Sequence, residues 1–284
     1  MFVYETSEPE ITTAFAFQPI IDADSAQPTA YRLVLRGGAD SGAIQYAPMI
    51  EAAIGAAAAA GIGERRAQLL LPLGTQGDMP EQLLQSLVRA AMRHRIALSS
   101  LIVSVSAGEY GDTEAAARLI AASERRGLAI ALHDFAAAPA GIQLLARVSP
   151  RFLRIDATLV RAIDASSARR QILESVMRLA RRAGADVIAP GIQSPAELAA
   201  LHGIGIRQVE GDWIAPATAR LAMPHLCDEP ALGLGRAIEP RRANAAVARR
   251  EIGSAHRRLQ HHHRASGRPA PTAEGPVQLM PLPA

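Results

Sequence analysis

The sequence contains no lysine, because all thirty of its basic residues are arginines. This absence excludes a Walker-type phosphate loop, a Schiff-base lysine and a lysine general base. The single cysteine, Cys227, excludes a disulfide framework and a cysteine-rich zinc site, and it suits a reducing compartment. Aromatic residues make up only 4% of the chain, so we expect a core built from Ala, Leu, Ile and Val.

Long apolar runs are also missing. No run approaches the roughly 18 residues that a membrane-spanning helix needs. The N-terminal residues lack the basic and then apolar layout of a secretory signal. We therefore expect a cytoplasmic protein without a transmembrane segment.

Positive charge is concentrated toward the C-terminal end. The chain of 284 residues has a formal net charge of +3, and the residues from Arg236 onward hold nine Arg and three Glu. Subtracting that segment's +6 leaves −3 for residues 1–235. The basic balance therefore belongs to the C-terminal segment, and it does not predict a basic nucleic-acid-binding domain in the remainder.

Short apolar segments alternate with longer helical patterns along most of the chain, which favours strands buried on both faces of a parallel sheet. The predicted strands are residues 14–21, 31–36, 68–72, 101–105, 128–133, 152–155, 186–189 and 208–212. The predicted helices are residues 52–60, 81–94, 114–125, 169–182 and one that begins at the capping box Ser194-Pro195-Ala196-Glu197. Eight strands with interleaved helices favour a closed (β/α)8-type barrel, and an open doubly wound sheet is the alternative.

The composition changes after Leu226, which divides the chain into a barrel at 1–225 and a flexible Arg- and Pro-rich tail at 226–284. Arginine pairs recur every eight residues from 241 to 258, and on a helix this spacing would form a basic stripe. Such a stripe suits an acidic protein, a nucleic acid or an anionic membrane surface, and a solvated tail is the alternative. The tract His261-His262-His263 lacks a fixed geometry and predicts no metal site.

Several motifs follow the predicted strands in a fixed order. Leu132-His133-Asp134-Phe135 is followed by Gly141-Ile142, Leu144-Leu145 and Arg154-Ile155-Asp156. This order and spacing resemble the EAL domain family, barrel phosphodiesterases that hydrolyse the bacterial second messenger cyclic-di-GMP. The resemblance extends from about Phe15 to Pro216. It implies a (β/α)8-type barrel of the EAL kind, with its chemistry at the carboxyl ends of the strands.

The resemblance also implies two divalent metal ions held by oxygen donors, yet most of the matching positions carry other residues. Arg32 stands at the glutamate that names the family, and Pro72 stands at an asparagine ligand. Ser104 and Ala107 stand at two acidic positions, and His133 replaces the first aspartate of an Asp-Asp pair. None of these five side chains offers the carboxylate or amide oxygen that such a site uses.

The remaining catalytic positions of the family are changed as well. Pro190 and Gln193 stand at two glutamates of one motif, Arg154 stands at the catalytic lysine, and Glu210 stands at a glutamine near the last strand. Arginine remains protonated and shares a proton with water poorly. We therefore predict no catalytic residue, no bound metal and no cofactor.

Three retained residues are candidates for nucleotide binding: Gln18, Arg36 and Asp134. Gln18 matches a family position that contacts a guanine edge, and Arg36 matches one that contacts a phosphate oxygen. The alternative is that local hydrogen bonds hold these side chains. We interpret His133 as a hydrogen-bonded strand-end residue rather than a base. Trp213 is either a stacking platform for a base or a packing residue.

Taken together, the sequence predicts a catalytically inactive EAL-like regulatory protein of bacterial cyclic-di-GMP-related signalling. We expect it to act by contacting a protein partner, which the sequence does not identify. One alternative is a receptor that binds cyclic-di-GMP without cleaving it, and another is a residual cyclic-di-GMP phosphodiesterase. The Arg-rich tail is a candidate site for an anionic partner.

Overall fold

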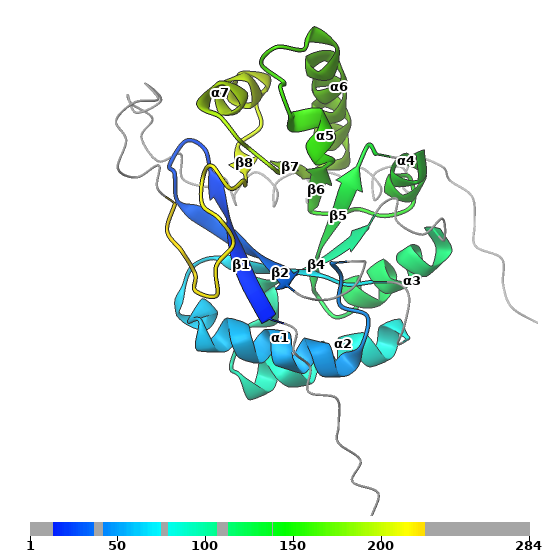
Figure 1. The fold of residues 1–284 in the computed structure, drawn as a ribbon. Helices are drawn as coiled ribbons and strands as arrows, with labels where there is room; N and C mark the ends of the chain where they lie inside the picture. Colours follow the sequence, from blue (N-terminus) through cyan, green and yellow to red (C-terminus); the bar gives the residue numbers. More distant parts are fainter. Residues whose placement is uncertain (1–13, 37–41, 75–78, 107–112, 138, 225–284) are drawn as a thin grey trace, which may run out of the picture. The chain divides into compact units, whose positions relative to one another are not determined.

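The computed structural model describes residues 14–36, 42–74, 79–106, 113–137 and 139–224. Eight strands close into a barrel in the order β1 to β8 (Figure 1). The strands are β1 (Ala14–Asp22), β2 (Pro28–Arg36), β3 (Gln68–Pro72), β4 (Leu101–Ser106), β5 (Ala129–Phe135), β6 (Phe152–Ile155), β7 (Asp186–Ala189) and β8 (Gln208–Val209). The predicted closed barrel is confirmed, and the ranges predicted for β3, β6 and β7 match the structure.

Helices connect successive strands from β2 onward and lie around the barrel (Figure 1). They are α1 (Ala47–Ala59), α2 (Pro80–Arg93), α3 (Thr113–Glu124), α4 (Pro139–Leu145), α5 (Ala157–Val160), α6 (Ser167–Ala183) and α7 (Pro195–Ile204), with short 3-10 turns η1 (Ile62–Glu64) and η2 (Leu98–Ser100). Helix α1 begins five residues before the predicted start, because Pro48 fits the first turn of a helix.

The first strand departs from the parallel sheet that the sequence predicts. β1 runs antiparallel to both β2 and β8, whereas the pairs from β2 to β8 are parallel. Only the five residues 23–27 join β1 to β2, and a parallel crossover needs a dozen or more residues. The short connection therefore forces a hairpin, and this signal was present in the sequence.

Residue alternation along the strands places the candidate site. One buried cluster fills the inside of the barrel and consists of Ile20, Ala30, Leu70, Ile102, Ala131, Phe152 and Ile188. Side chains two positions apart in a strand share a face, so the residues two positions toward the carboxyl ends also face inward. Because β1 is antiparallel to its neighbours, its corresponding inward-facing residue lies two positions earlier in the sequence. These inward-facing positions are Gln18, Arg32, Pro72, Ser104, His133, Arg154 and Pro190.

Helix α7 begins as predicted, with one difference in how its first turn is satisfied. The hydroxyl of Ser194 accepts a hydrogen bond from the backbone N–H of Glu197 at 3.2 Å, and Pro195 follows in the first turn. In the predicted capping box, the carboxylate of Glu197 would accept a hydrogen bond from the backbone N–H of Ser194. It accepts instead from the backbone N–H groups of Gln193 at 2.8 Å and Ala162 at 2.7 Å. This buried carboxylate therefore ties the loop before α7 to the loop before α6.

Some of the sequence-based predictions concern residues that the structure does not describe. The tail at 226–284, its arginine pairs, the His261-His262-His263 tract and Ala107 are among the residues whose structure is not described. Among the helices that are described, none combines the length and the apolar character needed to cross a bilayer.

The last strand ends earlier than the sequence predicts. The predicted range was 208–212, but β8 ends at Val209. The backbone then turns, because the carbonyl of Gly211 accepts hydrogen bonds from the N–H groups of Ile214 and Ala215, both at 3.0 Å. Gly211 lies directly against the backbone of Ile192 in the preceding loop.

Replacing Gly211 with alanine should destabilise the barrel. A Cβ at this position would lie 2.3 Å from the carbonyl oxygen of Ile192 and 2.4 Å from its nitrogen, which requires the backbone to move. We expect Gly211→Ala to lower the free energy of unfolding by about 3 kcal/mol, measured by urea denaturation. Gly63→Ala is the matched control, because nothing lies within 4 Å of its Cβ position. Equal stability of the two variants would contradict the assigned contact.

Candidate functional site

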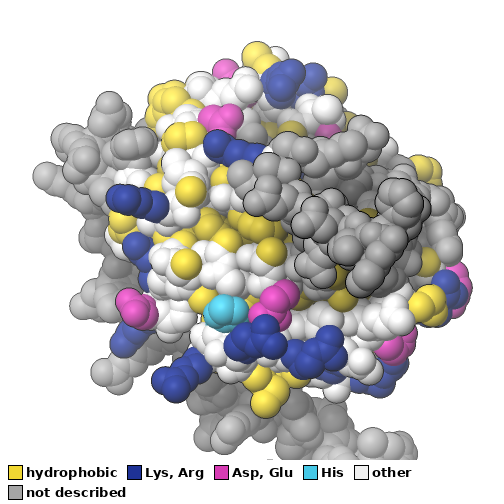
Figure 2. All heavy atoms as spheres, turned by 60° about the horizontal axis from the view of Figure 1, so that its bottom comes forward, with side chains coloured by type: hydrophobic (Ala, Val, Ile, Leu, Met, Phe, Trp, Pro, Cys, Tyr) yellow, Lys and Arg dark blue, Asp and Glu magenta, His cyan; other side chains and the backbone are white. Residues whose placement is uncertain are grey.

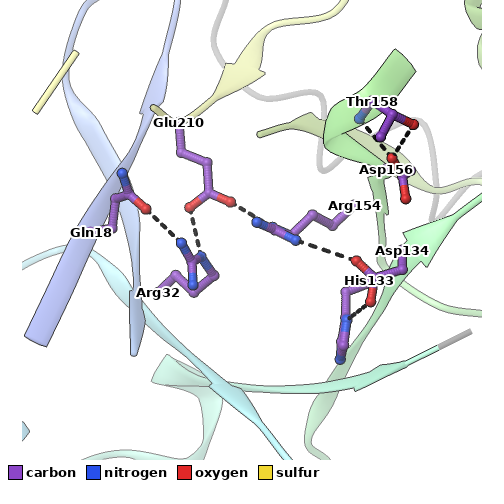
Figure 3. Close-up of polar contacts among 8 residues, drawn as sticks. All are labelled: Gln18, Arg32, His133, Asp134, Arg154, Asp156, Thr158 and Glu210. Carbon is purple, nitrogen blue, oxygen red and sulfur yellow. Dashed lines mark hydrogen bonds and ion pairs between the residues drawn. The ribbon is translucent and has the colours of Figure 1, made fainter. Parts of the chain in front are cut away.

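Four of the inward-facing side chains, Gln18, Arg32, His133 and Arg154, form a connected polar network with Glu210 and Asp134 (Figure 3). Arg32, from β2, donates through Nε to Oε2 of Glu210 at 2.9 Å and through Nη2 to Oε1 of Gln18 at 2.5 Å. Gln18 lies opposite Arg32 in the antiparallel register of β1 and β2, which brings the two side chains together. Arg32 therefore links the first strand to the residue that follows the last one.

A second arginine reaches the same carboxylate from the opposite side. Arg154, from β6, donates through Nε to Oε1 of Glu210 at 2.5 Å, and its Nη1 lies 3.9 Å from Oδ1 of Asp134. Each oxygen of Glu210 thus accepts from a different guanidinium, and the residue is only 1% exposed. Burial opposes ionisation of Glu210, but Arg154 and Arg32 outweigh it and hold the pKa of this carboxyl below its ordinary value.

Asp134 and His133 extend the network to the end of β5. Oδ2 of Asp134 lies 2.8 Å from Nδ1 of His133. The backbone of Asp134 is in the left-handed region, with a φ of 54°. The hydrogen bond from His133 is the main cause that lowers the pKa of Asp134. Burial raises this pKa, whereas the charge of Arg154 and a hydrogen bond from Ser106 lower it further. His133 is therefore a hydrogen-bonded strand-end residue, as its position predicted.

Two buried polar atoms in this region have no hydrogen-bond partner among the described residues. They are Oγ of Ser104, on β4, and Nε2 of His133, on the neighbouring strand β5. Because Asp134 contacts Nδ1, the Nε2 atom is not engaged by that pair. A hydroxyl and an imidazole nitrogen suit a small neutral hydrogen-bonding group better than a hard divalent cation, which prefers carboxylate oxygens.

The two proline positions and Gln193 supply no polar side chain to the network. Pro72 pairs with Ser104 in the register of β3 and β4, and Pro190 is buried after β7. Gln193 is exposed, and the structure records its backbone N–H bound to Glu197. In the described part of the chain, no group of three or more His, Cys, Asp or Glu side chains is placed to hold a metal ion. These residues do not fit the pair of divalent cations that the resemblance implies.

Each nucleotide-binding candidate contacts another part of the protein, although only Gln18 is buried. Gln18 is 7% exposed, and its Nε2 donates to Oδ1 of Asp212 at 3.0 Å and, more weakly, to the carbonyl of Ala215 at 3.5 Å. Arg36 donates through Nη2 to the carbonyl of Ala217. Trp213 is partly buried and packs against the hydrophobic core. The structure thus brings Gln18 and Asp134 into one network and holds Arg36 by a separate bond.

The pairing of the two arginines with one glutamate is the main feature that reasoning from the sequence missed. The signal was present, because Arg32, Arg154 and Glu210 all differ from the family residues at positions around one barrel mouth. Two introduced cations and one introduced anion on inward-facing positions indicate mutual compensation. Asp212 also contacts this network, because its Oδ1 accepts a hydrogen bond from the amide of Gln18.

A family model for the EAL domain matches residues 10–217, and the chain belongs to this family of cyclic-di-GMP signalling domains. The chain is 25% identical over 229 residues to the blue light- and temperature-regulated antirepressor BluF of Escherichia coli (strain K12), a match that covers 74% of this chain and 55% of BluF. It therefore spans about half the length of that relative.

Solved structures share the same fold. A standalone EAL protein from Vibrio cholerae O395, in its cyclic-di-GMP-bound form, superposes with a TM-score of 0.69 at 21% identity, over 80% of this chain and 99% of that one. Klebsiella pneumoniae BlrP1, in a complex with manganese and cyclic-di-GMP, gives a TM-score of 0.62 at 21% identity, over 74% of this chain and 57% of that one. The EAL-type barrel is thus shown from both the sequence and the structure.

Neutralising Glu210 should destabilise the fold and remove a pH dependence. We expect Glu210→Gln to lower the free energy of unfolding by about 3 kcal/mol at pH 7, because two partly buried guanidiniums lose their shared buried anion. Since the folded-state pKa lies below the ordinary 4.5, the contribution of Glu210 is complete above that pH and is lost as the pH falls through the folded-state pKa. The difference between wild type and variant, measured by urea denaturation across pH, should therefore shrink below about pH 4.5.

The matched control is the same change in an exposed ion pair. Glu51 pairs with Arg93 at 2.5 Å on the surface, so Glu51→Gln should cost only about 0.5 kcal/mol. A similar loss of unfolding free energy in the two variants would contradict the pairing described for Glu210. So would a stability difference between wild type and Glu210→Gln that stays constant as the pH falls below about 4.5.

Proposed function

We propose that this EAL domain does not hydrolyse cyclic-di-GMP and acts by contacting another protein. The observation that supports this proposal is the position of two guanidiniums, from Arg32 and Arg154, on either side of Glu210 at the carboxyl ends of the strands. In a metal-dependent phosphodiesterase, cations at the mouth activate water and neutralise the phosphodiester. Here fixed protein cations are already paired with Glu210.

The chemistry of the arginines argues against a substitute mechanism. A guanidinium stays protonated at neutral pH, so neither arginine accepts a proton from an attacking water. Asp134 keeps a partly exposed carboxylate, but His133 and Arg154 lie against its two oxygens. A single such carboxylate falls short of the oxygen donors that a two-metal site requires.

The similarity to BluF supports the protein-contact half of the proposal. BluF is an antirepressor, and a protein of that kind acts on a repressor. A barrel that keeps its fold while charged side chains at its mouth pair with one another still offers a folded surface for such a contact. The receptor alternative has less support, because the amide of Gln18 already binds Arg32 and Asp212.

Incubation of the purified chain with cyclic-di-GMP and Mn²⁺ or Mg²⁺ tests the proposal. We expect no linear dinucleotide above the protein-free blank by chromatography, because no metal-activated water forms at the mouth. Calorimetric titration at about 100 μM protein should give no heat of cyclic-di-GMP binding. Affinity capture from extract of the source cells should retain a protein in an amount comparable to the bait.

The control is the Asp134→Ala variant assayed in parallel. Linear product that disappears in this variant would establish hydrolysis at this mouth and overturn the proposal. Saturable cyclic-di-GMP binding without product would favour the receptor alternative. Capture that retains no protein would remove the support for the contact half.

A further inference from the structure

A groove of about 390 Å³ lies on the helix layer, away from the network at the barrel mouth. Its lining residues are Gln85, Val88 and Arg89 of α2, Leu98 of η2 and Arg126, which follows α3. Leu98 precedes β4 and Arg126 precedes β5, so the groove lies toward the amino ends of the strands. The mouth network lies at the carboxyl ends, and the two sites do not share a residue.

The floor of the groove is apolar. Val88 and Leu98 are partly buried, and Leu98 packs against the hydrophobic core, which fixes its position. Met92 lies one helical turn beyond Val88 and is 73% exposed. The apolar surface of α2 therefore continues from the groove onto the open face of the helix, where a large hydrophobic side chain faces solvent.

Two arginines flank this apolar floor, and each donates to a neutral acceptor three or four residues earlier in the chain. Nη2 of Arg89 donates to Oγ of Ser86 at 2.8 Å, and Nη1 of Arg126 donates to the carbonyl of Ala122 at 2.8 Å. Within the described ranges, neither guanidinium forms an ion pair with a carboxylate. Each bond restrains one nitrogen and leaves the positive charge uncompensated.

The surroundings of the groove are basic as well. Figure 2 shows the side that carries α1 and α2, with hydrophobic side chains gathered among arginines and fewer acids. Arg95 follows α2, and the acids Glu51 and Glu81 on this side are already paired with Arg93 and Arg125. This basic surface belongs to residues 1–235, whose formal charge is −3, so positive charge is locally concentrated here.

We propose that this groove binds an acidic amphipathic segment of a partner protein. An apolar side chain of the segment packs between Val88 and Leu98, and its carboxylates pair with Arg89 and Arg126. The proposal rests on the proposed function, since it assigns the surface that meets the partner. A single apolar hollow between two cations favours a peptide over the evenly spaced charges of a nucleic acid.

The probe is a synthetic 12-residue peptide in which glutamates flank leucines spaced four residues apart, labelled with fluorescein. Anisotropy titration with the full chain should give saturable binding with a dissociation constant below about 1 mM. Arg89→Glu should weaken binding at least tenfold, because it places a carboxylate opposite the peptide's own carboxylates.

Arg178→Glu is the matched control. Arg178, on α6, donates through Nη2 to Oγ of Ser175 at 2.7 Å, which is the same local contact three residues back in a helix that Arg89 makes. It does not line the groove, so its charge reversal should leave peptide binding unchanged. A peptide with lysine in place of glutamate should bind at least tenfold more weakly to the wild-type chain.

Three results would overturn the proposal: no binding of the acidic peptide, equal weakening by Arg89→Glu and Arg178→Glu, or equal binding of the lysine peptide. Displacement of the bound peptide by duplex DNA, or by vesicles of phosphatidylserine and phosphatidylcholine, at lower concentration than by unlabelled peptide would assign the surface to another class of partner. If peptide binding fails while no cyclic-di-GMP is hydrolysed, the groove assignment fails and the proposed function stands. Hydrolysis of cyclic-di-GMP would overturn the proposed function whatever the peptide does.

Discussion

The structure of the barrel mouth depends on one buried carboxylate held between two guanidiniums. Burying the ionised Glu210, which is 1% exposed, would cost free energy if it had no partner. Without Glu210, the guanidiniums of Arg32 and Arg154 would repel each other. Paired as they are, the three side chains satisfy the two carboxylate oxygens and connect β2, β6 and the residue after β8. Removing Glu210 would leave two guanidiniums without their shared carboxylate, and removing either arginine would leave one oxygen of Glu210 without its donor.

This interaction links the fold to the proposed function. Family members place oxygen donors at inward-facing positions around the mouth, and the barrel alternation delivers those positions whatever residues fill them. In this chain four of these positions, Gln18, Arg32, His133 and Arg154, hold side chains that pair with other side chains of the protein. Residues at the positions that hydrolysis would use therefore bind one another and stabilise the barrel. This arrangement favours the proposed role in protein–protein contact over one in hydrolysis.

Strands whose limits are set by local pattern could be predicted from the sequence. β3, β6 and β7 are apolar runs bounded by polar residues, and their predicted ends match the structure. The antiparallel β1 was missed because its pattern resembles any buried strand, although the short link to β2 excludes a crossover. After β8, Gly211 lies against the backbone of Ile192, a contact between two loops that no local pattern encodes.

The candidate site was predictable in its positions and not in its pairings. The resemblance to the EAL family placed Arg32, Arg154 and Glu210 at one mouth, but which oxygen meets which nitrogen depends on side-chain geometry in the folded barrel. The contact of Gln18 with Asp212 is of the same kind, since 194 residues separate them. The groove beside α2 has no motif at all, because its residues come from three elements and share only their place in space.

A crystal grown with excess Mn²⁺ tests the central claim most directly, through anomalous scattering at the manganese edge. The account predicts no manganese peak between Asp134 and Glu210, with both guanidiniums still bound to the glutamate. Two well-ordered peaks there, with Arg32 and Arg154 swung away from Glu210, would contradict it.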